Sequence, residues 1–282
     1  MPTPQVALAA RASFAECPAW DAVEGTLLWV DMNACAVHRF DPARGPVATW
    51  TFDQPVAAAR PRAGGGLVLS LRDGIAVTEA DDASLRWLVD WSDRGVRGND
   101  TGIDAAGRLW AGTIAGESAP GRLSRVSPDG TLDVAADGVQ LSNGIGWSPD
   151  GTRMYFVDTR TRRIDVFDYD MRAGRATGRR VFVEVADTAG APDGLCVDAE
   201  GAVWVALFRG GAVRRYTSDG RLDQEIAFPV SLTSSCAFGG PDLTDLYVTS
   251  ARRDLGDVEP LAGNLFVVPG AGQGLAPVPF AG

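Results

Sequence analysis

The fold class that the sequence predicts is all-β, in the form of a six-bladed β-propeller. Paired strand-like segments recur along the chain at a nearly constant spacing, and turn residues separate them. The 282 residues include 34 glycines and 17 prolines, a composition that suits many short strands joined by tight turns. With 45% hydrophobic residues, the chain can also form a large apolar core.

The first strand-like segment of each repeat is apolar or alternating and ends in a turn signal. These segments are 26–31, 66–70, 108–112, 153–158, 202–206 and 245–249. A second strand-like run follows each of them, at 36–40, 74–78, 121–126, 163–167, 212–216 and 263–268. Such patterns indicate β-strands, and a spacing of about 40 to 50 residues is the period of a propeller blade.

Aspartate and glycine occupy sharp reversals between the runs, as at 104–107, 148–151, 198–201 and 218–220. We interpret these aspartates as turn formers, because a calcium-binding EF-hand loop needs a fixed series of oxygen ligands that these segments do not supply. Six four-stranded blades around a central channel would close their sheet edges against one another. Since no shift in composition marks a linker, we expect residues 1–282 to form a single domain.

The charge balance bounds the partners of the protein. Its 26 basic and 36 acidic residues give a formal net charge of −10, and nucleic-acid binding depends on clustered basic residues, so no nucleic-acid partner is expected. The N-terminus lacks the features of a signal peptide, and no segment approaches the roughly 18 apolar residues of a membrane span. We therefore expect a cytoplasmic protein without a membrane partner, as a monomer or a weak homo-oligomer.

Four cysteines are present, and their spacing does not match a metal-binding or redox motif. We expect them to be buried and reduced, because disulfides are rare in cytoplasmic proteins. Cys17 and Cys196 lie close in sequence to Glu16 and Asp193, so either cysteine is a candidate for the lining of a functional site.

Glu16, Asn143 and Asp193 each lie where a strand-rich repeat begins or ends. In a propeller the innermost strands converge on the axis, so these residues would meet at one mouth of the channel. Two carboxylates and an amide oxygen suit Ca²⁺, Mg²⁺ or Mn²⁺. The absence of histidine and thiolate disfavours a dedicated zinc site, although the affinity order still places Zn²⁺ and Fe²⁺ above Mg²⁺. Taken alone, each residue has a turn or capping role as its alternative.

Six short strings occur in order along the chain. They are Ala15-Glu16-Cys17-Pro18-Ala19-Trp20, Arg97-Gly98-Asn99-Asp100, Trp110-Ala111-Gly112-Thr113-Ile114, Ser142-Asn143-Gly144, Pro192-Asp193-Gly194 and Thr233-Ser234-Ser235-Cys236-Ala237-Phe238-Gly239-Gly240. In these strings and their spacing, over nearly its whole length, the chain resembles the SMP-30/gluconolactonase/luciferin-regenerating-enzyme family of six-bladed propellers. The first three strings follow that family's patterns G/A-E-x-P-x-W, R-x-N-D and W-x-G-T-M.

The resemblance implies one divalent metal ion in the central channel, held by Glu16, Asn143 and Asp193 with water completing the shell. It also implies that Arg97 and Asn99 line a substrate pocket.

Glu117 stands where the family has a carboxylate. The chain departs from the family at Thr101, a position where the family frequently has glycine. It departs again at Gly116, because the family commonly has two adjacent acidic residues at the positions of Gly116 and Glu117. These two departures predict a differently shaped substrate pocket.

The activity expected from these features is hydrolysis of sugar lactones, such as glucono- or xylonolactone, to aldonic acids in a sugar-oxidation pathway. The enzyme would be a hydrolase of carboxylic esters that uses one Ca²⁺, Zn²⁺, Mn²⁺, Mg²⁺ or Fe²⁺ ion to polarise the lactone carbonyl. Asp193, with a second oxygen free, would act as general base toward water. Arg97, Asn99 and Glu117 would hydrogen-bond the ring hydroxyls. The alternative for Arg97 is a surface salt bridge.

Other catalytic schemes have less support in the sequence. His38 is the only histidine and lies in a strand-like run beside Arg39, which disfavours nucleophilic catalysis by Ser-His or Cys-His pairs. The glycine run 64–66 has no following lysine and is interpreted as a hairpin turn rather than a phosphate-binding loop.

Two other functions stay open. One is hydrolysis of a different lactone or of a phosphotriester, and the other is a non-catalytic propeller that serves as an interaction scaffold or a sugar-acid sensor. Metal-dependent turnover distinguishes catalysis from the non-catalytic roles.

Overall fold

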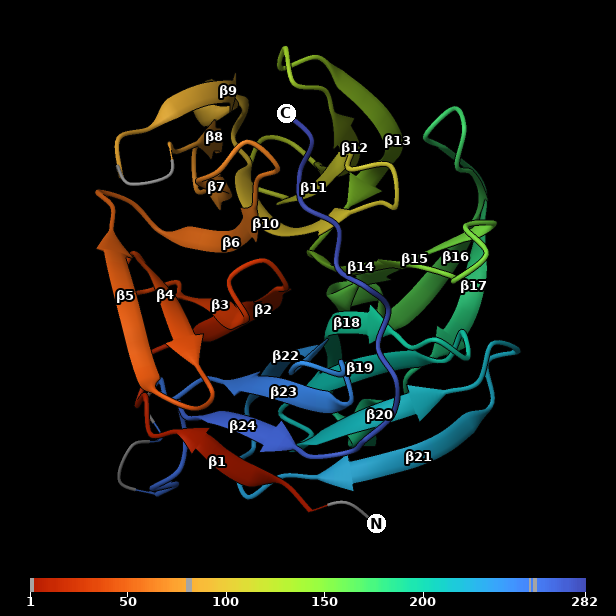
Figure 1. Cartoon of the computed structure of the whole chain (residues 1–282). Coiled ribbons are helices and arrows are strands. Elements are labelled where there is room, and N and C mark those ends of the chain that lie inside the picture. Colours follow the sequence, from red (N-terminus) through yellow and green to blue (C-terminus); the bar gives the residue numbers. More distant parts are fainter. Residues whose placement is uncertain (1–2, 80–82, 254, 256–257) are drawn as a thin grey trace.

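The computed structural model describes residues 3–79, 83–253, 255 and 258–282. Six antiparallel four-stranded sheets stand around a common axis like the blades of a propeller (Figure 1). The predicted fold class, an all-β six-bladed propeller, is therefore confirmed. Within the described ranges, no helix has the length and apolar character needed to cross a membrane.

The first three blades follow one another along the chain, and each begins with its innermost strand. Blade 1 contains β2 (Ala15–Asp21), β3 (Thr26–Asp31), β4 (Ala36–Asp41) and β5 (Gly45–Thr51). Blade 2 contains β6 (Val56–Pro61), β7 (Leu67–Leu71), β8 (Gly74–Val77) and β9 (Arg86–Asp90). Blade 3 contains β10 (Arg97–Ile103), β11 (Leu109–Ile114), β12 (Gly121–Val126) and β13 (Leu132–Val139).

The remaining blades repeat this order. Blade 4 contains β14 (Ser142–Trp147), β15 (Arg153–Asp158), β16 (Arg163–Asp170) and β17 (Arg175–Glu184). Blade 5 contains β18 (Ala191–Val197), β19 (Val203–Phe208), β20 (Ala212–Tyr216) and β21 (Leu222–Ala227). Blade 6 contains β22 (Thr233–Gly239), β23 (Asp245–Ser250), β24 (Leu265–Val268) and β1 (Gln5–Leu8). Three 3-10 turns, η1 (Ser92–Arg94), η2 (Thr159–Thr161) and η3 (Asp187–Ala189), lie in the connections.

The twelve segments predicted from the sequence are the second and third strands of the six blades. The pairing of the two chain ends was not predicted. Val6 of β1 pairs with Phe266 of β24, so the N-terminal strand is the outermost strand of the last blade, beside the C-terminal strands (Figure 1). This pairing closes the ring without leaving an open sheet edge between the ends.

Apolar side chains fill the space between neighbouring blades. Tyr155 and Ile164 of blade 4 pack with Leu195 and Val203 of blade 5 in one buried cluster. Each sheet thus has a neighbour on both faces, so its middle strands are buried on both sides and have nearly continuous apolar sequences. This is the reason why the second and third strands were visible in the sequence.

Every innermost strand carries one extra residue opposite its partner strand. In four blades the inner strand advances by three residues while its neighbour advances by two. These stretches are Glu16–Ala19, Gly98–Thr101, Ser142–Ile145 and Pro192–Leu195. In the other two blades the inner strand advances by two residues while its neighbour advances by one, at Val56–Ala58 and Thr233–Ser235. These are β-bulges, which turn the bulged side chains away from the regular alternation of the strand.

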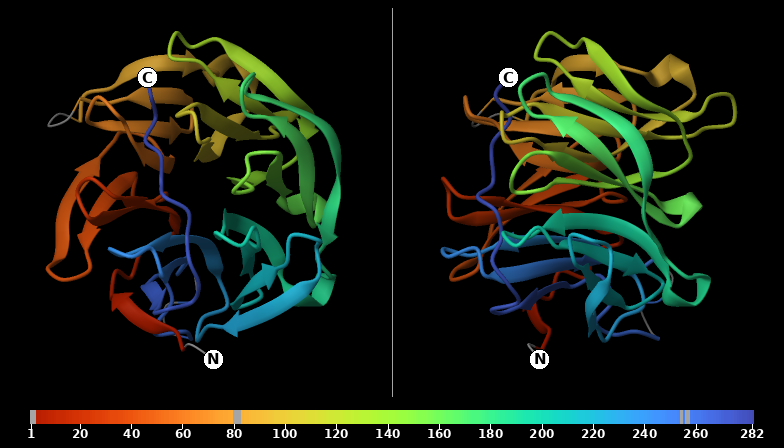
Figure 2. Two further views of the ribbon diagram at one scale, coloured as in Figure 1. Left: turned by 45° about the vertical axis from the view of Figure 1, so that its right-hand side comes forward. Right: turned by 90° about the vertical axis from the view of Figure 1, so that its right-hand side faces the viewer.

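The C-terminal segment, residues 270–282, crosses one end of the channel on a single face of the ring (Figures 1 and 2). Gly274 bridges to Asp198 of blade 5, and Phe280 bridges to Arg62 beside blade 2. We call this the covered end of the channel. A cavity of about 930 Å³ lies there, and its walls include Trp20, Trp147 and Phe238 together with residues of the crossing segment.

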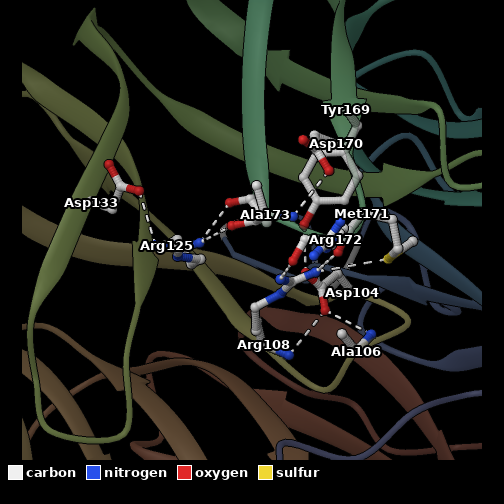
Figure 3. Close-up of polar contacts among 11 residues, drawn as sticks. Asp104, Ala106, Arg108, Arg125, Asp133, Tyr169, Asp170, Met171, Arg172 and Ala173 are labelled. Atoms are coloured by element: carbon white, nitrogen blue, oxygen red, sulfur yellow. Dashed lines mark hydrogen bonds and ion pairs between the residues drawn. The ribbon is translucent and has the colours of Figure 1, made fainter.

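Asp104 joins blades 3 and 4 near the covered end (Figure 3). Its carboxylate is fully buried and accepts hydrogen bonds from Arg108 Nε at 2.7 Å and Ala106 N at 2.9 Å. The hydroxyl of Tyr169 in β16 also donates to it. Burial, followed by the hydrogen bond to Asp104, raises the pKa of Tyr169. A turn-forming aspartate therefore also acts as a connection between two blades.

We predict that Asp104→Ala lowers the free energy of unfolding by about 3 kcal/mol, because the substitution removes one partner of a buried charged pair. Chemical denaturation with the midpoint and slope fitted separately measures this change. Asp129→Ala is the control, since it removes an exposed carboxylate that bonds within its own turn and should barely move the midpoint. Equal shifts for the two variants would contradict the role of Asp104.

Candidate functional site

The predicted metal ligands lie at the bulges of three innermost strands. Glu16 is in β2, Asn143 in β14 and Asp193 in β18, and their exposed fractions are 8%, 5% and 5%. Because the bulges occupy the same place in each blade, these side chains lie at one end of the channel. We call it the acidic end, opposite the covered end.

Glycine follows two of these residues because the innermost strands of neighbouring blades approach closely. A Cβ atom on Gly144 would lie 2.4 Å from the backbone nitrogen of Leu195, and one on Gly194 would lie 2.0 Å from Ser235 Oγ. Neither site has room for a side chain. The Asn-Gly and Asp-Gly pairs in the sequence therefore reflect packing around the axis rather than hairpin turns.

The two acidic side chains interact electrostatically. Burial raises the pKa of Glu16 well above its ordinary value, and the negative charges of Asp193 and Asp100 raise it further. Burial likewise raises the pKa of Asp193 well above its ordinary value, with a further contribution from Asp100. Buried carboxylates close enough to repel one another favour either a proton or a bound cation.

The amide of Asn143 has a defined orientation. Thr159 Oγ1 donates a hydrogen bond to Pro192 O at 2.7 Å, so it accepts from Asn143 Nδ2, also at 2.7 Å. Asn143 Oδ1 consequently points the other way, where Asn99 Nδ2 donates to it at 2.8 Å. Thr159 thus fixes which end of the amide faces Asn99, and sequence reasoning did not identify this residue because its contacts span two blades.

Asp100 is a second residue that sequence reasoning missed, although it belongs to the Arg-Gly-Asn-Asp string. Its Oδ1 accepts hydrogen bonds from Cys17 Sγ at 3.0 Å and from Thr101 N at 2.7 Å. Arg60 Nη2 forms an ion pair with the same oxygen at 3.3 Å. Asp100 therefore has a cationic partner, and no described cationic side chain forms an ion pair with Glu16 or Asp193.

The two candidate cysteines differ in their positions. Cys17 is buried and contacts Asp100 at the acidic end. Cys196 lines the cavity at the covered end, and its Sγ lies 3.7 Å from Cys236 Sγ. All four cysteines are free thiols.

Of the predicted substrate-binding residues, Asn99 directly contacts a predicted metal ligand. Arg97, at the start of β10, lies with its Nη1 3.9 Å from Met32 Sδ, and burial lowers its pKa. No described carboxylate forms an ion pair with Arg97, so the structure does not place it in a surface salt bridge. Glu117 is exposed in the connection between β11 and β12, and within the described part of the chain it forms no hydrogen bond or ion pair with Glu16, Asn143 or Asp193.

The donor set fits a hard divalent cation. Asp193 Oδ1 is buried and receives no hydrogen bond from any described residue, which leaves a charged oxygen free for a cation. Glu16 contributes a second carboxylate and Asn143 an oriented amide oxygen, the ligand types that Ca²⁺, Mg²⁺ and Mn²⁺ prefer. No three Asp, Glu, His or Cys side chains within residues 3–79, 83–253, 255 and 258–282 form a metal-binding group by themselves. A three-ligand site here therefore depends on the amide of Asn143.

We predict that Glu16→Gln stabilises the protein in the presence of a chelator at pH 8, by on the order of 1 kcal/mol. The raised pKa of Glu16 means that the folded state binds more protons than the unfolded state between the two pKa values. The contribution of the protonated Glu16 side chain to folding stability is fully present below the ordinary glutamate pKa of about 4.3. This contribution is lost as the pH rises through the pKa that Glu16 has in the folded protein. The gain from Glu16→Gln should therefore vanish near pH 4.

Urea denaturation from pH 4 to pH 8 measures this effect. Glu24→Gln is the control, because Glu24 is exposed in the β2–β3 connection and should give a pH-independent difference. A Glu16→Gln variant that is less stable than the parent protein at pH 8 would contradict the assigned electrostatics.

Comparison with known proteins supplies the family. The family model described as SMP-30/Gluconolactonase/LRE-like region matches residues 14–252, which include Glu16, Asn143 and Asp193. Regucalcin from Xenopus laevis is 36% identical over 282 aligned residues, covering 95% of this chain and 94% of the relative. Regucalcin from Homo sapiens shows the same identity and coverage.

Solved structures agree with this result. A luciferin-regenerating enzyme has a TM-score of 0.92 and 30% identity, covering 100% of both chains. A gluconolactonase from Xanthomonas campestris has a TM-score of 0.77 and 26% identity, covering 94% of this chain and 89% of that one. The chain belongs to the SMP-30/gluconolactonase/luciferin-regenerating-enzyme family.

Proposed function

We propose that the protein is a metal-dependent lactonase that hydrolyses sugar lactones to aldonic acids. The observation that carries the proposal is the pair of buried carboxylates, Glu16 and Asp193, at one end of the channel, with Asp193 Oδ1 lacking a hydrogen-bond donor. Membership of a family that includes gluconolactonases supports the same reaction class.

Glu16, Asn143 and Asp193 would hold the cation through their side-chain oxygens. When bound, a divalent cation would supply Lewis-acid polarisation of the lactone carbonyl and a more acidic water molecule. The ion is one of Ca²⁺, Zn²⁺, Mn²⁺, Mg²⁺ or Fe²⁺; a protein from Agrobacterium tumefaciens with a TM-score of 0.92 and 29% identity is described as a calcium-binding regucalcin.

Asp193 would accept the proton of the attacking water. A positioned carboxylate can serve as the general base for such a proton transfer. With Oδ1 assigned to the cation, the second carboxylate oxygen is the atom that would take the proton.

Asn99 and Arg97 would position the sugar ring. Asn99 uses both amide hydrogens on Ser142 O at 2.6 Å and Asn143 Oδ1 at 2.8 Å, so its own oxygen is left to accept from a substrate hydroxyl. Arg97 brings an unpaired guanidinium to the same end of the channel. Glu117 would reach the substrate from its exposed connection, as the resemblance implies.

The alternative functions make different demands on the acidic end. A structural scaffold gains nothing from two buried carboxylates without a basic partner, because their repulsion destabilises the fold. A sugar-acid sensor would bind product-like ligands without turnover. A phosphotriesterase would use the same donor set on another electrophile, so substrate profiling separates it from a lactonase.

We predict that chelator-treated protein releases protons from aldonolactones only at the spontaneous rate, and that one or more of the five cations restores turnover. Asp193→Asn keeps a ligand oxygen but not a base, so its kcat should fall by about 10²- to 10⁴-fold, with a smaller loss of cation affinity. A pH-stat assay on a lactone panel measures kcat, and calorimetric titration measures the affinity.

Asp219→Asn is the control, because Asp219 lies in an exposed turn at the other end of blade 5. Equal losses of kcat and of cation affinity in Asp193→Asn would reduce Asp193 to a ligand. No turnover above background with any cation, in folded protein, would refute the lactonase.

A further inference from the structure

Several arginines in the connections at the acidic end form no ion pair with a described carboxylate. Arg160 is in η2, Arg209 follows β19, and Arg253 lies in the connection after β23. All three are exposed, and none forms an ion pair with a described carboxylate. Arg162, at the end of η2, instead contacts Asp187, and Arg215 contacts Asp198. The charge of Arg160, Arg209 and Arg253 is therefore available to a ligand at this end of the channel.

Of the three, Arg253 lies against aromatic rings. Its guanidinium carbon lies 5.2 Å from the ring centroid of Phe14 and 5.9 Å from that of Phe208. The two rings stack on each other with centroids 5.7 Å apart. The backbone nitrogen of Arg253 donates to Ser13 O at 3.1 Å. Aromatic faces of this kind hold a guanidinium without neutralising its charge.

The stacked rings connect Arg253 to the acidic residues. Phe14 lies two positions before Glu16 in the sequence. Phe208 pairs with Ala191, which lies two positions before Asp193. Arg253 therefore sits at the channel end that holds both carboxylates, and Arg209 directly follows one of the two rings that support it.

Arg97 approaches the same place from blade 3. Its Nη1 is 3.9 Å from Met32 Sδ, and Met32 N donates to Phe14 O at 2.9 Å. Arg97 and Arg253 thus flank the segment of Phe14 without sharing a carboxylate. Guanidinium groups at the mouth of the channel would attract a ligand that carries a negative charge.

We propose that Arg253 and Arg209 form an anion-binding subsite, and that the preferred lactone carries a carboxylate or a phosphate group besides its lactone ring. The subsite rests on the proposed lactonase function. The ring enters toward Glu16 and Asp193, and the anionic substituent remains at the mouth, where a guanidinium matches the geometry of either oxyanion.

Matched pairs of lactones test the proposal on the metal-loaded protein. D-Glucono-1,4-lactone is compared with D-glucaro-1,4-lactone, which adds a carboxylate. D-Glucono-1,5-lactone is compared with its 6-phosphate. The anionic member of at least one pair should have a kcat/KM higher by about tenfold, the size of one charge-assisted hydrogen bond. This preference should fall as salt is added, and the pair with the larger ratio identifies the anionic group.

Charge-removing variants locate the subsite. Arg253→Gln and Arg209→Gln should each lower the anionic-to-neutral ratio of kcat/KM, by up to about tenfold. Arg221→Gln is the matched control, because Arg221 is exposed in the β20–β21 connection at the other end of the ring and its loss should leave the ratio unchanged.

The outcomes separate this proposal from the lactonase itself. Turnover of neutral lactones with kcat/KM equal to or above that of both anionic partners would overturn the subsite and leave the lactonase intact. If no lactone is hydrolysed, calorimetric binding of glucarate and gluconate decides the subsite. Tighter binding of glucarate that is lost in Arg253→Gln would support it, and equal binding of the two acids would overturn it.

Discussion

One extra residue in the innermost strand of every blade is the constraint on which the site depends. A regular strand would alternate its side chains between the two blade interfaces, and no residue would be directed to the axis. The bulges break that alternation at one level of the ring, where Asn99, Asn143 and Asp193 occupy corresponding positions in three successive blades. Glu16 borders the bulge of blade 1. The propeller thus brings Glu16 together with Asn143 and Asp193, which lie 127 and 177 residues further along the chain.

Charge is distributed unevenly along the axis. Arg60 neutralises Asp100, while Glu16 and Asp193 have no cationic partner among the described residues. The resulting repulsion, together with burial, raises the pKa values of both carboxylates and prepares the acidic end for a cation. Arg160, Arg209 and Arg253 are exposed at this end. The crossing C-terminal segment and a cavity lined by apolar and charged residues, Arg60 and Asp100 among them, lie at the other.

The sequence predicted the parts of the fold that depend on local pattern. The second and third strands of each blade are buried on both faces and were visible as apolar runs, but β14 (Ser142–Trp147) combines glycine with polar residues and has no such pattern. The pairing of β1 with β24 joins opposite chain ends and has no local signal. Asn99 and the three predicted ligands were predicted from short strings, whereas the role of Thr159 depends on contacts between blades. Glu117 lies in an exposed connection, which sequence spacing alone cannot relate to the axis.

The central claim is that the bulges bring Glu16, Asn143 and Asp193 together around one divalent cation. Anomalous diffraction from crystals grown with Mn²⁺ tests it most directly, because the metal's position is located independently of the protein atoms. The account predicts a single strong peak on the channel axis, within about 2.0–2.6 Å of an oxygen from each of the three side chains. A peak elsewhere, or none at a saturating Mn²⁺ concentration, would contradict it.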